Sequence, residues 1–115
     1  MISPTNENMR DAIQIADHYG LESRMSILQE ECAELIQSVS KLRRSSSTGL
    51  DTAEKREAYL VARNSVAEEM ADVQILLLEL SHLMRNEGML EFQMNFKLKR
   101  TLSDIEKEEK SHARA

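Results

Sequence analysis

The chain lacks most of what a β-sheet protein needs. Of its 115 residues only 3% are aromatic, tryptophan is absent, and there are three glycines and one proline. Strands favour aromatic and β-branched side chains and need turn residues between them, so a many-stranded architecture is excluded. A chain of this length suits one domain. We therefore expect an all-α fold in a single domain spanning residues 1–115, with its core at about 5–105 and a frayed tail at 106–115.

Cysteine and long apolar runs are also scarce. The one cysteine, Cys32, cannot form an internal disulfide, and the most apolar stretch, residues 75–78, is short and ends at Glu79. These absences predict a cytoplasmic protein without a membrane partner. The formal charge is -5, because 20 acidic residues outnumber 15 basic ones. Such a balance repels a phosphate backbone, so nucleic acid is not an expected partner.

Apolar residues recur at helical spacing in four segments separated by glycine-containing breaks. The predicted helices run from about 5 to 18, 21 to 44, 51 to 87 and 89 to 105. In the third, Asp51 and Glu54 have the form of a capping pair, and the span is either one long helix or two collinear ones, with Asn64–Ser65 as the expected kink. The serine-rich segment 45–49 is expected to be a flexible connection. Together these segments predict a four-helix bundle.

The same acidic pattern occurs in the second and third predicted helices. Residues 30–35 read EECAEL, and residues 68–73 read EEMADV. In helical projection two carboxylates of each copy flank an apolar stripe, at about 60° and 120° in both copies. These four carboxylates are Glu31, Glu34, Glu69 and Asp72. If the two helices pack antiparallel, the matching flanks converge, and the crowded negative charges need a counter-charge.

A divalent cation supplies that counter-charge. Carboxylate oxygens suit Mg²⁺ or Mn²⁺, and Mg²⁺ commonly completes its coordination shell with substrate phosphates. Cations held in this way can lower the pKa of a water and neutralise a leaving pyrophosphate. The chain has no glycine-rich phosphate loop and no cysteine spacing typical of zinc sites. The pattern therefore predicts metal-dependent phosphate chemistry without a side-chain nucleophile.

At these residues the sequence resembles the MazG-like all-α nucleoside triphosphate pyrophosphohydrolases, which carry an E-E-x-x-E block and an E-x-x-D block on neighbouring helices. Here the blocks are residues 30–34 and 69–72. The resemblance extends to IADHYGL at 15–21 and FKLKR at 96–100, and so covers most of the chain. The spacer between the blocks, residues 35–68, is longer than is usual in the family.

The resemblance implies Mg²⁺-dependent hydrolysis of nucleoside or deoxynucleoside triphosphates to a monophosphate and pyrophosphate, in housecleaning or regulation of the nucleotide pool. It implies Mg²⁺ as cofactor, with Mn²⁺ as a substitute. The metal ligands that it implies are Glu31, Glu34, Glu69 and Asp72, and Glu30 joins them as a catalytic residue. Lys97 and Arg100 stand where the family carries phosphate-binding residues.

Other interpretations stay open at this point. Acidic clusters on helices are usually solvated faces, and the chain could be a noncatalytic helical interaction module that docks through its apolar third helix. Glu79 and His82 have the spacing of half a di-iron motif, but no second half is present. A nucleotide pyrophosphohydrolase explains the repeated carboxylates better, because an interaction module has no need for them at equal angles on two helices.

The third predicted helix also indicates self-association. Val73, Leu77 and Leu80 lie in one stripe, whereas Ile75 and Leu78 point to other faces. A helix that is apolar on all sides is normally buried on all sides, and a short chain cannot cover it alone. We therefore expect a homodimer or homotetramer, as in MazG-like relatives.

Overall fold

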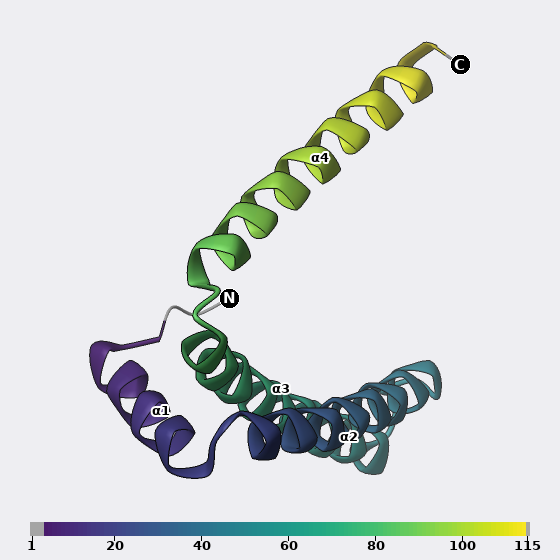
Figure 1. The fold of residues 1–115 in the computed structure, drawn as a ribbon. Helices are drawn as coiled ribbons and strands as arrows, with labels where there is room; N and C mark the ends of the chain where they lie inside the picture. Colours follow the sequence, from purple (N-terminus) through teal and green to yellow (C-terminus); the bar gives the residue numbers. More distant parts are fainter. Residues whose placement is uncertain (1–3, 115) are drawn as a thin grey trace. The chain divides into compact units, whose positions relative to one another are not determined.

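The computed structural model describes residues 4–114, and all of its regular structure is helical (Figure 1). Its four helices are α1 (Asn6–Tyr19), α2 (Leu21–Ser47), α3 (Ala53–Met84) and α4 (Glu87–Arg114). No strand occurs within these residues, which confirms the all-α class. None of the described helices combines the length and apolar character needed to cross a membrane.

The chain divides into two compact units. The first ends at Met84 and contains α1, α2 and α3, whereas the second begins at Arg85 and contains α4. The sequence predicts one domain over residues 1–115, and residues 1–3 and 115 of that range lie outside the described part. The predicted metal ligands all belong to the first unit.

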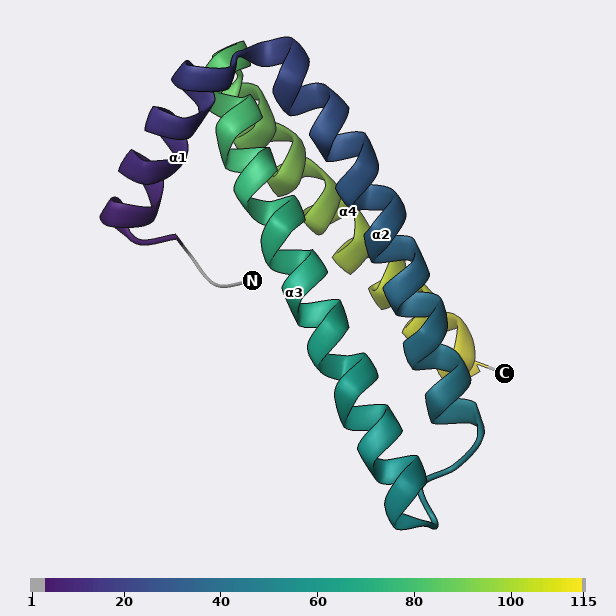
Figure 2. The ribbon, with the colours of Figure 1, turned by 90° about the horizontal axis from the view of Figure 1, so that it is seen from below.

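In the first unit α2 and α3 lie side by side and antiparallel, as two views of the ribbon agree (Figure 1, Figure 2). They are joined by residues 48–52. α3 continues unbroken through Asn64–Ser65, so this span is one helix rather than two. The antiparallel pairing is the arrangement that brings the two acidic blocks to the same stretch of the interface.

The serine-rich segment 45–49 is largely helical, contrary to the prediction of a flexible connection, because α2 extends to Ser47. The hydroxyls of Ser47 and Thr48 each donate to the backbone carbonyl three residues earlier, both at 2.9 Å. These bonds satisfy carbonyls that a helix end leaves without partners. Gly49, with φ at 89°, then adopts a left-handed conformation that helps to end the helix.

α3 begins with a threonine cap. Thr52 Oγ1 accepts a hydrogen bond of 3.1 Å from the backbone N–H of Lys55, as an N-cap side chain does. Asp51 instead accepts a hydrogen bond of 2.9 Å from the Lys55 ammonium group, which lowers the pKa of Asp51. The predicted Asp51–Glu54 capping pair is therefore wrong.

The break before α4 lies earlier than the sequence predicts. Arg85 takes a left-handed φ of 53° directly after α3, and Gly88 lies within the first turn of α4. α4 then continues through residues 106–114, the segment for which fraying is predicted.

The core of the first unit is small and lies where α1 packs on α3. Ala12 and Ala16 of α1 are buried with Leu76 and Leu80 of α3. Alanine side chains allow close approach of the two helices. Gly20, with φ at 87°, separates α1 from α2, and its N–H donates to the Ala16 carbonyl at 2.8 Å. A glycine permits this left-handed turn without strain.

Candidate metal centre

Three acidic side chains meet at the interface of α2 and α3. Glu31 comes from α2, and Glu69 and Asp72 come from α3. One carboxylate oxygen from each residue lies within 4.8 Å of the other two. The structure thus brings together three of the four predicted metal ligands, one from the first acidic block and two from the second.

The other two predicted catalytic carboxylates, Glu30 and Glu34, are not part of this cluster. Glu34 is exposed and does not belong to the set of three, but its negative charge adds to the partial burial that raises the pKa of both Glu31 and Glu69. Glu30 is also exposed and is not in the set. The predicted phosphate-binding residues, Lys97 and Arg100, lie on α4 in the second unit.

The cluster holds protons more tightly than isolated carboxylates do. Partial burial raises the pKa of Glu31 to about 7, and the negative charges of Glu34 and Asp72 add to the effect. Partial burial also raises the pKa of Glu69, with the same two neighbours contributing. Crowded carboxylates disfavour the ionised state until a proton or a cation neutralises them.

Two oxygens of the cluster have no hydrogen-bond donor among the described residues. The Oε2 atoms of Glu31 and Glu69 are buried and have no hydrogen-bond partner. When Glu31 is protonated it donates a hydrogen bond to Glu69, which favours the proton on Glu31. Buried carboxylate oxygens that lack a hydrogen-bond donor are groups that a bound cation can satisfy.

The donor set fits a hard divalent cation. All three groups offer oxygen, and Mg²⁺ binds oxygen at roughly 2.0–2.1 Å, which places neighbouring ligands roughly 3–4 Å apart. The three oxygens, within 4.8 Å of one another, need to move together by only a fraction of that distance. Asp72 is exposed, so solvent or a phosphate oxygen can reach the remaining coordination positions.

Cation affinity is expected to rise with pH. Because the pKa of Glu31 is raised to about 7, the folded protein binds a proton there that the unfolded chain has released, so this group stabilises the fold less as the pH rises from about 4.5 to 7. A cation must displace that proton. Calorimetry should therefore show Mg²⁺ binding tighten between about pH 5.5 and 7.5, and Glu31→Gln should weaken binding and flatten the trend. A constant affinity over this range would contradict the proton competition.

A second pair of charged side chains, Arg24 and Glu79, lies about two helical turns from the cluster along the same interface. The predictions from the sequence do not include this pairing. Glu79 is only 1% exposed, and its Oε2 lies 3.7 Å from Nη1 of Arg24, a part-buried residue of α2. Burial raises the pKa of Glu79, whereas the Arg24 charge lowers it. Arg24 and Glu79 stand seven residues from Glu31 and Asp72 respectively, and this shared spacing is the signal that could have revealed them.

Glu79 and His82 each contact another residue, so the two side chains do not form half of a di-iron site together. Glu79 pairs with Arg24, and His82 Nε2 lies 2.8 Å from Asp17 Oδ1 of α1. The Arg24 guanidinium also lies 4.5 Å from the centre of the Tyr19 ring. These contacts give Glu79 and His82 a structural role in joining α1 and α2 to α3.

No family model, curated protein or solved structure matches the chain. The fold and the site define a helical protein with a three-carboxylate cluster between two antiparallel helices.

Proposed function

We propose that the protein is a Mg²⁺-dependent nucleoside triphosphate pyrophosphohydrolase of the MazG-like type, acting on the cytoplasmic nucleotide pool. The observation that carries the proposal is the convergence of Glu31, Glu69 and Asp72 from two matching acidic blocks. A solvated acidic face has no reason to bury an unpaired oxygen of Glu31 and another of Glu69.

The residues of the first unit divide into two roles. Glu31, Glu69 and Asp72, with Glu34 beside them, would hold the cation, which supplies positive charge to phosphate oxygens and to an attacking water. Glu30, exposed on α2 next to this set in sequence, can accept the proton of that water. In the second unit, Lys97 and Arg100 are proposed to bind the polyphosphate through charge-assisted hydrogen bonds.

Product analysis tests the proposal. The protein should release pyrophosphate and a monophosphate from a panel of nucleoside and deoxynucleoside triphosphates in the presence of Mg²⁺ or Mn²⁺, and chelator should abolish the release. Release of orthophosphate instead would assign cleavage to another bond. No hydrolysis of any member of the panel would leave the helical interaction module as the better account.

The exposed apolar surface of the first unit supports self-association. Met70 and Leu77 of α3 are 57% and 48% exposed, and Ile36 of α2 is 67% exposed. Single exposed apolar residues are ordinary, but large side chains on two adjacent helices normally mark an interface. We propose that a second copy of the chain covers this surface and completes a helical bundle as a homodimer or homotetramer. The same surface is the observation that favours the alternative, an interaction module, whose partner would be another protein.

Oligomerisation is expected to depend on Leu77. Light scattering should give a mass of at least twice 13.2 kDa, and Leu77→Glu should shift the protein toward monomer or aggregate, because it places a charge in the apolar interface. Leu78 is a poorer test site, since it lines a groove of about 400 Å³ between α1 and α3. A stable monomer of the unsubstituted protein at micromolar concentration would contradict the assembly.

A further inference from the structure

The second unit presents two unlike apolar faces on the single helix α4. One is an aliphatic stripe at helical spacing, formed by Leu90, Met94, Leu98, Leu102 and Ile105. The other carries Phe92 and Phe96. Phe96 and Leu98 differ by about 200° around the helix axis, so the two faces point in nearly opposite directions. The aliphatic stripe suits packing against another helix, and the aromatic face needs a separate explanation.

The two phenylalanine rings form a stacked, accessible surface. Their centroids are 6.4 Å apart and their planes differ by only 11°. Phe92 is 65% exposed and Phe96 is 53% exposed. The Arg100 guanidinium lies 5.7 Å from the centre of the Phe96 ring, within the range of a cation–π contact. Two nearly parallel rings and a planar cation thus line one face of the helix.

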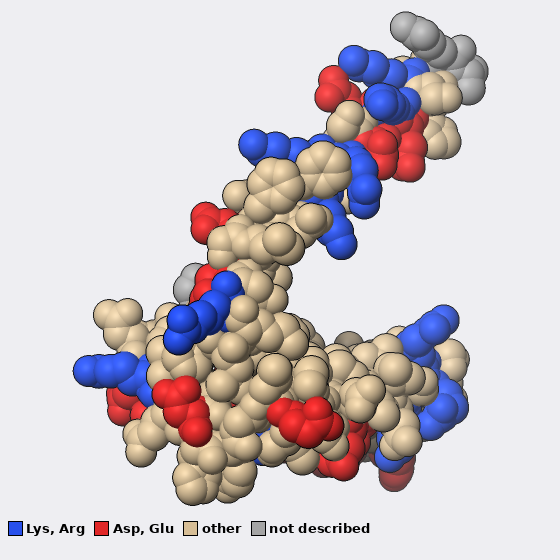
Figure 3. All heavy atoms as spheres, viewed as in Figure 1, with Lys and Arg blue, Asp and Glu red and all other residues tan. Residues whose placement is uncertain are grey.

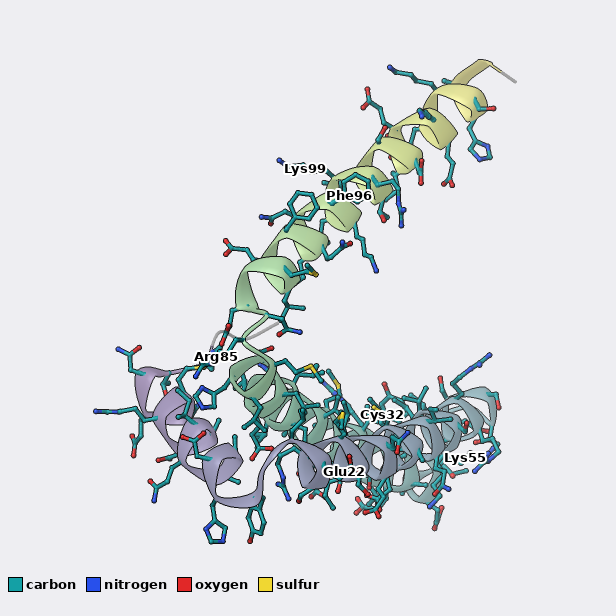
Figure 4. All side chains as sticks on the ribbon, viewed as in Figure 1. Glu22, Cys32, Lys55, Arg85, Phe96 and Lys99 are labelled. Atoms are coloured by element: carbon teal, nitrogen blue, oxygen red, sulfur yellow. The ribbon has the colours of Figure 1, made fainter. Side chains whose placement is uncertain are left out.

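Positive charge gathers around these rings. The residues three and four positions from Phe96, which share its face, are Phe92, Gln93, Lys99 and Arg100. None of them is acidic, although the chain as a whole has a charge of -5. Figure 3 shows Lys and Arg atoms beside the uncharged side chains midway along α4, and Figure 4 shows Phe96 and Lys99 projecting outward from the helix.

We propose that this aromatic–basic face, comprising Phe92, Phe96, Lys99 and Arg100, binds the base of a nucleotide by stacking while its cations contact the phosphates. The proposal rests on the proposed function for the identity of the nucleotide. A planar, electron-rich base stacks on an aromatic ring and on a guanidinium, and the negative phosphates complement the lysine and arginine. The base therefore matches the rings, and the phosphates match the charges.

An apolar protein partner fits this face less well. Covering the rings with another helix would remove Lys99 and Arg100 from water without offering them a counter-charge, which is unfavourable. A nucleotide brings its own negative charge. The opposite, aliphatic stripe remains available for helix packing, so the two faces can serve different purposes.

Stacking has a consequence for substrate choice. Every base has a π face, so a stacking platform tolerates all bases and favours those with the larger ring system. We therefore expect purine nucleotides to bind more tightly than pyrimidine nucleotides by a few-fold, with little discrimination between adenine and guanine.

The test separates base binding from phosphate binding. Calorimetry with Mg²⁺ compares two probes, the non-hydrolysable α,β-methylene ATP and inorganic tripolyphosphate, which lacks a base. Phe96→Leu keeps an apolar side chain and should weaken α,β-methylene ATP binding about tenfold while leaving tripolyphosphate binding unchanged. Arg100→Gln should weaken both. Leu98→Met, a conservative change on the aliphatic stripe, should weaken neither.

Other results would overturn the inference. Equal binding of α,β-methylene ATP by the unsubstituted protein and Phe96→Leu would show that the ring does not stack on the base, and pyrophosphate release by the same preparations would leave the proposed function standing. If Phe96→Leu weakened the binding of both probes equally, the ring would support the structure of α4 rather than contact the base. A single-stranded oligonucleotide that binds through Phe96 when the mononucleotide does not would assign the face to nucleic acid instead. Failure of the unsubstituted protein to bind either probe would overturn this inference and the proposed function together.

Discussion

Asp72→Asn is expected to lower pyrophosphate release by at least about a hundredfold, because it removes one negative oxygen donor from the cluster while keeping the side chain's shape. The asparagine oxygen is a neutral and weaker ligand, so the charge that stabilises the leaving pyrophosphate is held less well. Asp72 is exposed, and its replacement should not lower the melting temperature of the metal-free protein. A rise is expected because the charge of Asp72 raises the pKa of both Glu31 and Glu69.

The matched control for this variant is Glu68→Gln. Glu68 precedes Glu69 in the second acidic block, is exposed, and is not part of the cluster. Glu68→Gln makes the same change from carboxylate to amide a few residues from Asp72, and we expect near-normal turnover. Near-normal turnover by Asp72→Asn, or equal losses in the two variants, would refute the assignment of catalysis to the cluster.

Arg24→Met is expected to cause the largest loss of stability, about 3 kcal/mol at pH 8, because it leaves Glu79 buried without a counter-charge. In a protein of this size such a loss lowers the melting temperature by roughly 10 °C or more. Burial raises the pKa of Glu79 and Arg24 lowers it, so removal of the arginine raises that pKa further. The destabilisation should therefore be smaller at pH 5, where Glu79 can take up a proton, than at pH 8.

Two further variants make this expectation specific. Arg24→Met with Glu79→Leu should recover most of the stability, since an apolar pair of similar volume needs no charge balance. Lys55→Met removes the exposed ion pair with Asp51 and should change stability by less than about 1 kcal/mol. A loss at Arg24 that does not depend on pH, or that the double variant does not recover, would mean that Arg24 acts through packing alone.

The spacing of apolar and acidic residues in the sequence predicts both the positions of the helices and the meeting of the carboxylates. Apolar spacing marks the buried side of each helix, and acidic residues at fixed angles to that side must meet when two such helices pack antiparallel. Glu31, Glu69 and Asp72 meet in this way. Glu34 has the matching angle and lies outside the set of three, although its charge and a side-chain hydrogen bond add to the burial that raises the pKa of both Glu31 and Glu69.

Other features depend on interactions that residue spacing does not show. Serine and threonine hydroxyls bonded to carbonyls extend α2 to Ser47, where composition alone predicts a loop. Thr52 outcompetes Asp51 as the cap of α3 because Asp51 is engaged with Lys55. The pairing of Glu79 with Arg24 joins residues 55 positions apart, and such a contact becomes visible only after the packing of α2 on α3 is known.

The central claim is that the interface of α2 and α3 holds a divalent cation, and the melting temperature tests it most directly. A ligand that binds only the folded state stabilises it by mass action, so millimolar MgCl₂ should raise the melting temperature by several degrees above the value in NaCl of equal ionic strength. The difference should disappear in Glu69→Gln, which lacks one of the clustered donors. Identical melting curves in the two salts for the unsubstituted protein would contradict a metal centre at this site.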